Sequence, residues 1–147
     1  MVLAKGITGF CKECDVTTIE ENDYKEFRTA CYDAALHPEV TLVNIVECDY
    51  PFTYHKALFD INDERVIVLL NSYYPLVSFA KDDDPLDFCD IPEQLTALSK
   101  HYTLLDEDTL LTYPTGKELQ ALDGEELVAI EHWKPRNLGE IIFNTWD

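Results

Sequence analysis

The chain has 147 residues with 29 acidic and 11 basic side chains, which gives a formal charge of 11 − 29 = −18. Its 46% hydrophobic content is enough for a packed core and excludes a chain that is disordered over its whole length. No apolar run approaches the roughly 18 residues of a membrane-spanning helix, and Met1 to Phe10 is too short and interrupted for a signal peptide, so a single cytoplasmic domain, residues 1–147, is expected. A surface of this sign repels phosphate backbones and disfavours direct nucleic-acid binding.

The N-terminal region predicts a short strand followed by an amphipathic helix. Ala4 to Phe10 contains two glycines, which is typical of a bulged edge strand. Thr17 and Thr18 each precede a glutamate by three residues, the spacing of a capping box. Apolar residues then recur at three- and four-residue steps until His37-Pro38 ends the helix: Ile19, Phe27, Ala30, Cys31 and Ala34.

Four strand-like runs follow and predict an antiparallel meander. Val40 to Cys48 is rich in β-branched residues, and Tyr54 to Ile61 alternates between apolar and polar side chains. Arg65 to Asn71 is apolar on both faces, as in a central covered strand, and Leu76 to Ala80 is a shorter run. Short polar turns between sequential strands favour antiparallel neighbours.

The next segment is expected to hold short elements. Lys81 to Ile91 reads as an acidic loop, and Pro92 precedes a helix of about three turns that ends near His101. Tyr102 to Leu105 is compatible with a short strand. Asp106 is a candidate cap for a helix through Leu111, whereas Asp123-Gly124 predicts a turn.

The C-terminal part predicts a β-hairpin. Leu127 to Trp133 and Glu140 to Trp146 are aromatic and β-branched runs, joined by Lys134 to Gly139. The expected fold is therefore α+β: a single domain with a largely antiparallel sheet, the N-terminal amphipathic helix, and short helices packed mainly on one face. A doubly wound α/β fold is the alternative, weakened by the absence of a glycine-rich strand-to-helix turn.

Acidic residues are concentrated in residues 81–126, which hold 13 acidic and 3 basic side chains, a local charge of 3 − 13 = −10. Two clusters stand out: Asp82, Asp83 and Asp84, and Asp106, Glu107 and Asp108. They match no calcium-binding loop. One interpretation is a solvated surface with helix N-terminal charges, and the other is a site for a basic partner.

The cysteines predict no disulfide framework, because five cannot all pair within one chain and no secretory segment is apparent. Cys31 and Cys48 read as core residues. Cys11 and Cys14 form the single C-x-x-C, which lacks the second pair of a structural zinc site. No metal and no cofactor are therefore expected.

Candidate catalytic residues do not form a recognisable set. Nothing in the spacing pairs Cys31, Cys48 or Cys89 with one of the four histidines (His37, His55, His101, His132). His55 lies on an apolar strand face, where a hydrogen-bonded core histidine is the usual case. The segment Trp133 to Arg136 combines two basic residues with a tryptophan ring. It is expected either to bind an acidic ligand or to close the predicted hairpin.

The chain ends, Gly6 to Phe10 and Trp133 to Asp147, resemble stretches of small acidic cytoplasmic proteins of Gram-positive bacteria. Some proteins of this kind are immunity proteins that neutralise a secreted nuclease toxin. The resemblance implies that class of function and carries over no residue's role.

The leading hypothesis is a non-enzymatic acidic binding protein, with an immunity-type inhibitor of a basic toxin enzyme as its concrete form. The two acidic clusters would then meet lysines and arginines of the partner. The alternative is a small-ligand protein or enzyme with a pocket over the sheet near His55, Cys48 or Tyr54. A third reading is metal binding through Cys11 and Cys14, and the oligomeric state is left open.

Overall fold

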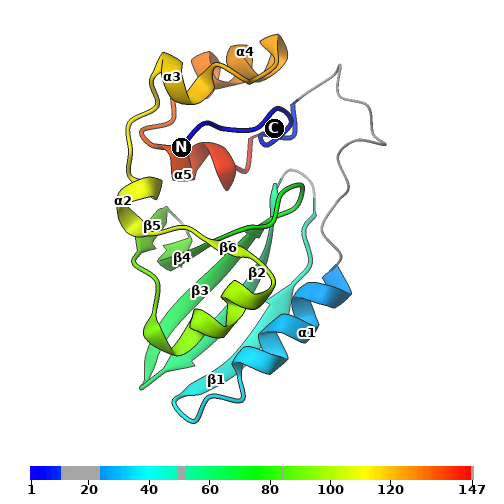
Figure 1. The fold of residues 1–147 in the computed structure, drawn as a ribbon, viewed down its shortest axis with the longest axis vertical. Coiled ribbons are helices and arrows are strands. Elements are labelled where there is room, and N and C mark those ends of the chain that lie inside the picture. Colours follow the sequence, from blue (N-terminus) through cyan, green and yellow to red (C-terminus); the bar gives the residue numbers. More distant parts are fainter. Residues whose placement is uncertain (11–23, 50–51, 84, 147) are drawn as a thin grey trace.

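The computed structural model describes residues 1–10, 24–49, 52–83 and 85–146. A six-stranded sheet has the order β1-β2-β3-β4-β5, with antiparallel neighbours and β6 parallel to β4 (Figure 1). Its strands are β1 Val40–Val46, β2 Tyr54–Ile61, β3 Glu64–Asn71, β4 Leu76–Asp83, β5 Leu86–Cys89 and β6 Thr103–Leu104. The expected α+β class and the meander of four sequential strands are confirmed.

The β2–β3 hairpin forms the centre of the meander. Asn62 and Asp63 have φ angles of 50° and 67°, and such a left-handed two-residue turn matches the twist of paired strands. The pairing then runs in unbroken register from Ile61 opposite Glu64 to Tyr54 opposite Asn71. Since β3 buries side chains on both faces, the prediction of a central covered strand is confirmed.

The helices are α1 Tyr24–Ala34, the 3₁₀ helix η1 Glu93–Lys100, α2 Glu107–Leu110, α3 Gly116–Leu119, α4 Gly124–Trp133 and α5 Leu138–Ile142. The expected apolar stripe of α1 is buried (Phe27, Ala30, Cys31 and Ala34). The helix start predicted at Thr17 and Thr18 lies outside the described residues. Asp106 caps α2 as predicted, because its carboxylate accepts a hydrogen bond from the Thr109 backbone N–H.

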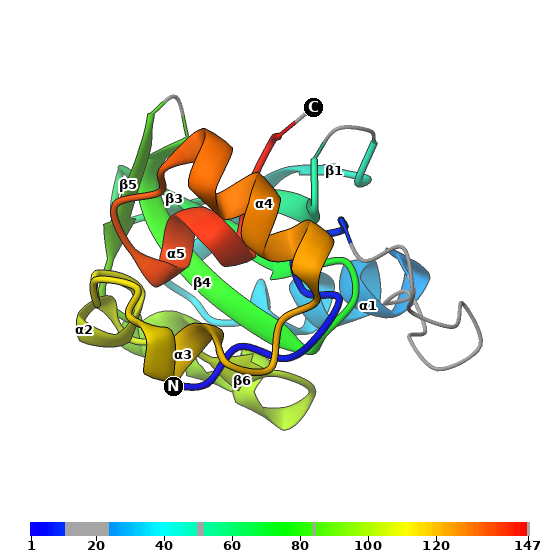
Figure 2. The same cartoon turned by 90° about the horizontal axis from the view of Figure 1, so that it is seen from above.

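Helices cover both faces of the sheet. On one face, here called the α1 face, Phe27 of α1 and Leu98 of η1 belong to a core cluster with Val68 and Phe79. On the other, the C-terminal face, α2, α4, α5 and residues 3–7 supply a second cluster with residues of β3, β4 and β5. Figure 2 looks down on α4 and α5, which lie in front of β3 and β4. The helices are therefore divided between the faces, and not gathered mainly on one.

The predicted C-terminal hairpin is wrong, because Leu127 to Trp133 lies in α4 and α5 occupies the start of the second run. Capping overrides the β-propensity of these residues. Asp123 and Glu126 form a capping box at α4, so Asp123-Gly124 begins a helix and does not make a turn. Asn137 caps α5 by accepting from the Glu140 N–H.

Two further predictions are corrected. Lys81 to Ile91 is not a loop, because β4 continues to Asp83 and β5 pairs with it. Acidic side chains are tolerated there since β5 is the last strand of the sheet order and they face solvent. Ala4 to Phe10 forms turns and not a strand, because Gly6 and Gly9 take φ angles of 91° and 80°.

Candidate functional site

The first acidic cluster lies on the β4–β5 hairpin. Asp82 is exposed, and its carboxylate accepts a hydrogen bond from the Asp83 backbone N–H at 2.8 Å. Asp83 is half-buried and forms an ion pair with Lys56 Nζ at 2.6 Å. Asp84 lies outside the described residues. Asp82 therefore lies exposed at the surface, and Asp83 is paired with Lys56.

The second cluster surrounds the start of α2. The Asp106 carboxylate accepts from Thr109 N–H at 2.8 Å, and hydrogen bonds from Thr109 lower the pKa of Asp106. Asp108 is exposed, and Glu107 is partly exposed. Asp106 thus serves its own helix, in line with the helix-terminus interpretation, while Glu107 and Asp108 leave carboxylates at the surface.

Strand β5 links the two clusters. Asp87, in the middle of β5, lies directly opposite Asp82 on β4. At the end of the strand, Asp90 accepts a hydrogen bond from the Glu107 backbone N–H at 3.4 Å. We call the resulting surface the acidic edge, defined as Asp82, Asp87, Asp90, Glu107 and Asp108. Asp87 and Asp90 were not singled out from the sequence, although Asp87 alternates with the apolar Leu86 and Phe88.

Carboxylates of the acidic edge affect the pKa of the Cys89 thiol. Burial raises the pKa of its thiol, the charges of Glu107, Asp87 and Asp90 raise it further, and the charge of Lys81 opposes them. The negative charges of Asp87 and Asp90 beside β5 and of Glu107 in α2 therefore act on one position of the sheet edge.

Beside Asp83 lies a hollow of about 220 Å³, formed by the start of β2, the β4–β5 turn and the C-terminal segment. Its wall includes the aromatic rings of Tyr54, Phe143 and Trp146, and its polar groups include Asp83, Arg136 and Glu140. Cavities of about 150 Å³ accept a benzene-sized molecule, so the hollow is large enough for one side chain.

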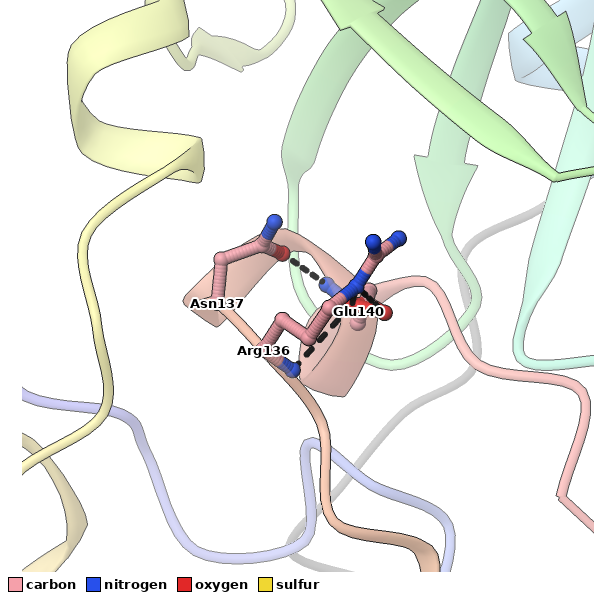
Figure 3. A network of polar contacts seen from close by, with 3 residues as sticks. All are labelled: Arg136, Asn137 and Glu140. Atoms are coloured by element: carbon pink, nitrogen blue, oxygen red, sulfur yellow. Dashed lines mark hydrogen bonds and ion pairs between the residues drawn. The ribbon is translucent and has the colours of Figure 1, made fainter.

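Arg136 and Glu140 are among the residues that line the hollow. Figure 3 shows their contact at the start of α5. Arg136 Nε lies 3.3 Å and 3.4 Å from the two carboxylate oxygens of Glu140, and the Arg136 backbone N–H donates to the same carboxylate. Asn137 fixes the loop by capping the Glu140 N–H at 2.9 Å. The Arg136 side chain is 76% exposed, so its guanidinium lies at the rim of the hollow beside Glu140.

Tyr54, a polar residue of the wall, is buried at 3% exposure. Burial raises its pKa to about 12, and the charges of Asp83 and Cys48 add to the effect. Within the described part of the chain, its hydroxyl makes no hydrogen bond. The hollow thus contains a phenol oxygen available to a ligand.

His55 and Cys48 do not line this hollow. His55 is buried on the α1 face with its ring 5.9 Å from that of Phe27, and its Nδ1 accepts from Cys48 N–H at 2.8 Å. Cys48 Sγ donates to the carbonyl oxygen of Phe52 at 3.0 Å. Of the three residues named for a pocket over the sheet, Tyr54 alone lies at the hollow.

Cys31 offers little reactivity. Cys31 is buried in α1, and burial raises its pKa to about 12. Cys11 and Cys14 lie outside the described residues. Within residues 1–10, 24–49, 52–83 and 85–146, no group of three or more histidine, cysteine or acidic side chains is arranged to hold a metal ion.

The segment Trp133 to Arg136 does not act as one cluster. Trp133 stacks on Trp146 with ring centroids 6.2 Å apart, and Lys134 ends α4 in the left-handed conformation. Arg136 turns instead to Glu140. The hairpin closure considered from the sequence is wrong, because α4 and α5 flank this segment, and binding of an acidic ligand by it stays a prediction.

A buried hydrogen-bond network, not anticipated from the sequence, positions the wall of the hollow. Asn144 donates its Nδ2 to Thr8 O at 3.2 Å, and its backbone N–H donates to Thr53 Oγ1 at 3.0 Å. Asn71 Nδ2 donates to Ile142 O at 2.8 Å. These bonds join the N-terminal turn, the β2–β3 hairpin and the C-terminal segment, and they fix the backbone on either side of Phe143.

Comparisons with protein-family models, curated proteins and solved structures gave no match to this chain. Among the described residues, no helix is long and apolar enough to cross a membrane. The acidic edge and the hollow are therefore the features of the molecule that bear on its function.

Proposed function

We propose that this protein is a non-enzymatic binding protein for a basic protein partner, in concrete form an immunity-type inhibitor of a basic toxin enzyme. The observation that carries the proposal is the acidic edge. It gathers carboxylates from β4, β5 and α2 on the last strand of the sheet order.

Charge favours this class of partner over others. The net charge of −18 attracts cationic proteins over a distance of about a Debye length and speeds their encounter. At the acidic edge the attraction is focused, because Asp82, Asp87 and Asp108 are exposed. A basic partner docked there would exchange solvent for carboxylates that are already placed by strand and helix backbone.

The test is the association rate with a basic secreted enzyme encoded beside the gene for this protein. We compare the wild type with a triple variant of the acidic edge, D82N/D87N/D108N. A matched triple variant, D33N/E47Q/E131Q, removes exposed acids elsewhere and has the same net charge of −18 + 3 = −15. At about 20 mM salt the acidic-edge variant should associate about tenfold more slowly than the matched variant.

Salt and enzyme inhibition complete the test. The difference between the two triple variants should shrink at about 300 mM salt, because the attraction is screened. Wild-type protein should abolish the activity of the enzyme at a one-to-one ratio. Equal association rates for the two triple variants at low salt contradict the proposal, and a neighbouring gene for an acidic or non-secreted protein contradicts the immunity-type form.

A further inference from the structure

We propose that the hollow beside Asp83 receives an arginine side chain of the basic partner. This inference rests on the proposed function and adds the group that is recognised. The hollow adjoins the acidic edge, since Asp83, which lines it, directly follows Asp82 in β4.

The shape of the hollow suits a long basic side chain. An arginine has an apolar stem and a planar charged end, and such stems pack along apolar surface while the charge stays with polar groups. In the hollow, the rings of Tyr54, Phe143 and Trp146 supply the apolar wall. The volume of about 220 Å³ exceeds the roughly 150 Å³ that holds a benzene-sized molecule.

The polar groups of the hollow are mainly acceptors. The carboxylates of Asp83, whose Oδ2 also pairs with Lys56, and of Glu140 match the donor fork of a guanidinium, which binds carboxylates through paired hydrogen bonds. The Tyr54 hydroxyl, 3% exposed as a residue and without a hydrogen bond in the described part of the chain, offers a further oxygen. This oxygen is not among the fully buried polar atoms without a partner in the described residues, so it can exchange a contact with solvent for a donor that enters the hollow.

Arg136 already places a guanidinium beside the Glu140 carboxylate at the rim of the hollow. Its guanidinium reaches Glu140 through Nε alone at 3.3–3.4 Å, and its side chain is 76% exposed. Exposed ion pairs of this kind contribute little, so an incoming arginine can displace Arg136 from Glu140 at small cost. Arg136 thus competes with the ligand, and its removal should tighten binding.

The first experiment uses N-acetyl-arginine amide as the probe and the fluorescence of Trp146 as the signal. Trp133→Phe leaves Trp146 as the sole tryptophan of the full-length chain, which has two, and keeps an aromatic ring against it. The probe should change the fluorescence saturably. Asp83→Asn and Glu140→Gln should each weaken binding about tenfold, and Tyr54→Phe about threefold.

Arg136→Gln shows whether the hollow binds a cation or an anion. If the hollow binds a cation, this variant should bind the probe about threefold more tightly. The matched controls come from the exposed Arg65–Asp60 pair, which lies outside the hollow: Arg65→Gln and Asp60→Asn change the same charges and should leave binding unchanged. N-acetyl-glycine, which carries a carboxylate, should not bind.

Three results overturn the inference: no saturable signal with the arginine probe, equal losses in Asp83→Asn and Asp60→Asn, or binding of N-acetyl-glycine that Arg136→Gln abolishes. The last would assign the hollow to an anion. Thermal unfolding of each variant checks its folding, and Tyr54→Phe keeps the test valid if Asp83→Asn is unstable. A partner that depends on the acidic edge but tolerates Tyr54→Phe and Glu140→Gln refutes this inference alone and leaves the proposed function standing.

Discussion

The two faces of the sheet are held together by different kinds of contact. On the α1 face, α1 and η1 bury a cluster of apolar side chains against the strands, including Phe27, Leu95 and Leu98. On the C-terminal face, an apolar cluster is joined by buried polar groups such as Asn71, Asn144 and Glu126. Both faces are packed, and the hydrogen bonds between buried groups of the described residues are concentrated on the C-terminal face.

The polar contacts of the C-terminal face join segments that are far apart in the sequence. Glu126 of α4 accepts from the backbone N–H groups of Gly6 and Thr8, from Thr8 Oγ1 at 2.5 Å, and from Asp123 N–H. Apolar burial is non-directional, whereas these bonds specify one arrangement of the two chain ends. The hollow lies at the face whose geometry is specified in this way.

The largest effect is expected from Asn144→Ala. The substitution leaves Thr8 O and Ile141 O without their Asn144 donor and Trp146 N–H without its acceptor, all at buried positions. We expect the free energy of unfolding to fall by about 4 kcal/mol in a urea titration.

The contrasting substitution on the α1 face is Leu98→Met, which conserves volume in an apolar cluster and should cost less than about 1.5 kcal/mol. If the two substitutions have similar effects, the distinction between the faces is refuted.

A smaller loss is expected from Gly139→Ala, which tests how closely α5 packs on β5. A Cβ at position 139 would lie 2.4 Å from Phe88 Cε2, so the ring or the helix must shift. We expect a loss of about 2 kcal/mol in thermal or urea unfolding. Gly124→Ala is the matched control, because its Cβ meets no atom within 4 Å and alanine favours a helix.

The smaller side chain in Phe88→Leu should reduce the cost of Gly139→Ala in a double-mutant cycle. Additive effects of the two substitutions would show that the contact does not couple them.

The sequence predicted those parts of the fold whose signals are local. In β2 apolar and polar side chains alternate, and in β3 both faces are apolar. These patterns can be recognised without knowledge of distant residues, and both strands lie where expected. The wrong prediction of strands at α4 and α5 also has a local cause. Asp123 with Glu126, and Asn137 with Glu140, have the three-residue spacing of helix caps, but the aromatic and β-branched residues that follow outweighed that signal in the prediction.

The candidate site was predictable only in part. Asp82, Glu107 and Asp108 were singled out from the charge pattern, but their union through Asp87 and Asp90 depends on the pairing of β5 with β4. The hollow combines residues near positions 54, 83 and 136–146, and no spacing in the sequence brings these together. Such sites follow from tertiary packing, which a reading of local periodicity does not contain.

Alkaline pH should act on both faces through one buried group each. Burial raises the pKa of Cys31 from 9.0 to about 12 on the α1 face, and that of Tyr54 from 10.0 to about 12 on the C-terminal face. Because the folded pKa exceeds the unfolded one, the stability that Tyr54 contributes is fully present below pH 10 and is lost as the pH rises toward 12.

Urea unfolding of the wild type and Tyr54→Phe at several alkaline pH values measures this contribution. The variant should lose less stability between pH 10 and about 12, whereas Cys31→Ala should reduce the loss from pH 9 upward. Identical pH dependence in all three proteins would mean that neither group ionises in the process of unfolding over this range.

The smallest effect is expected at the acidic edge, where binding and stability should oppose each other. Asp82 and Asp87 lie directly opposite across β4 and β5, and like charges in such a pair are destabilising. Asp87→Asn should therefore raise the free energy of unfolding by about 0.3 kcal/mol at low salt. Asp33→Asn on the exposed side of α1 removes the same charge without a cross-strand partner and is the control. A stabilisation confined to Asp87→Asn, together with slower association with the basic enzyme, would indicate that the paired acids are retained for binding at the expense of stability; equal stabilities of the two variants would remove that argument.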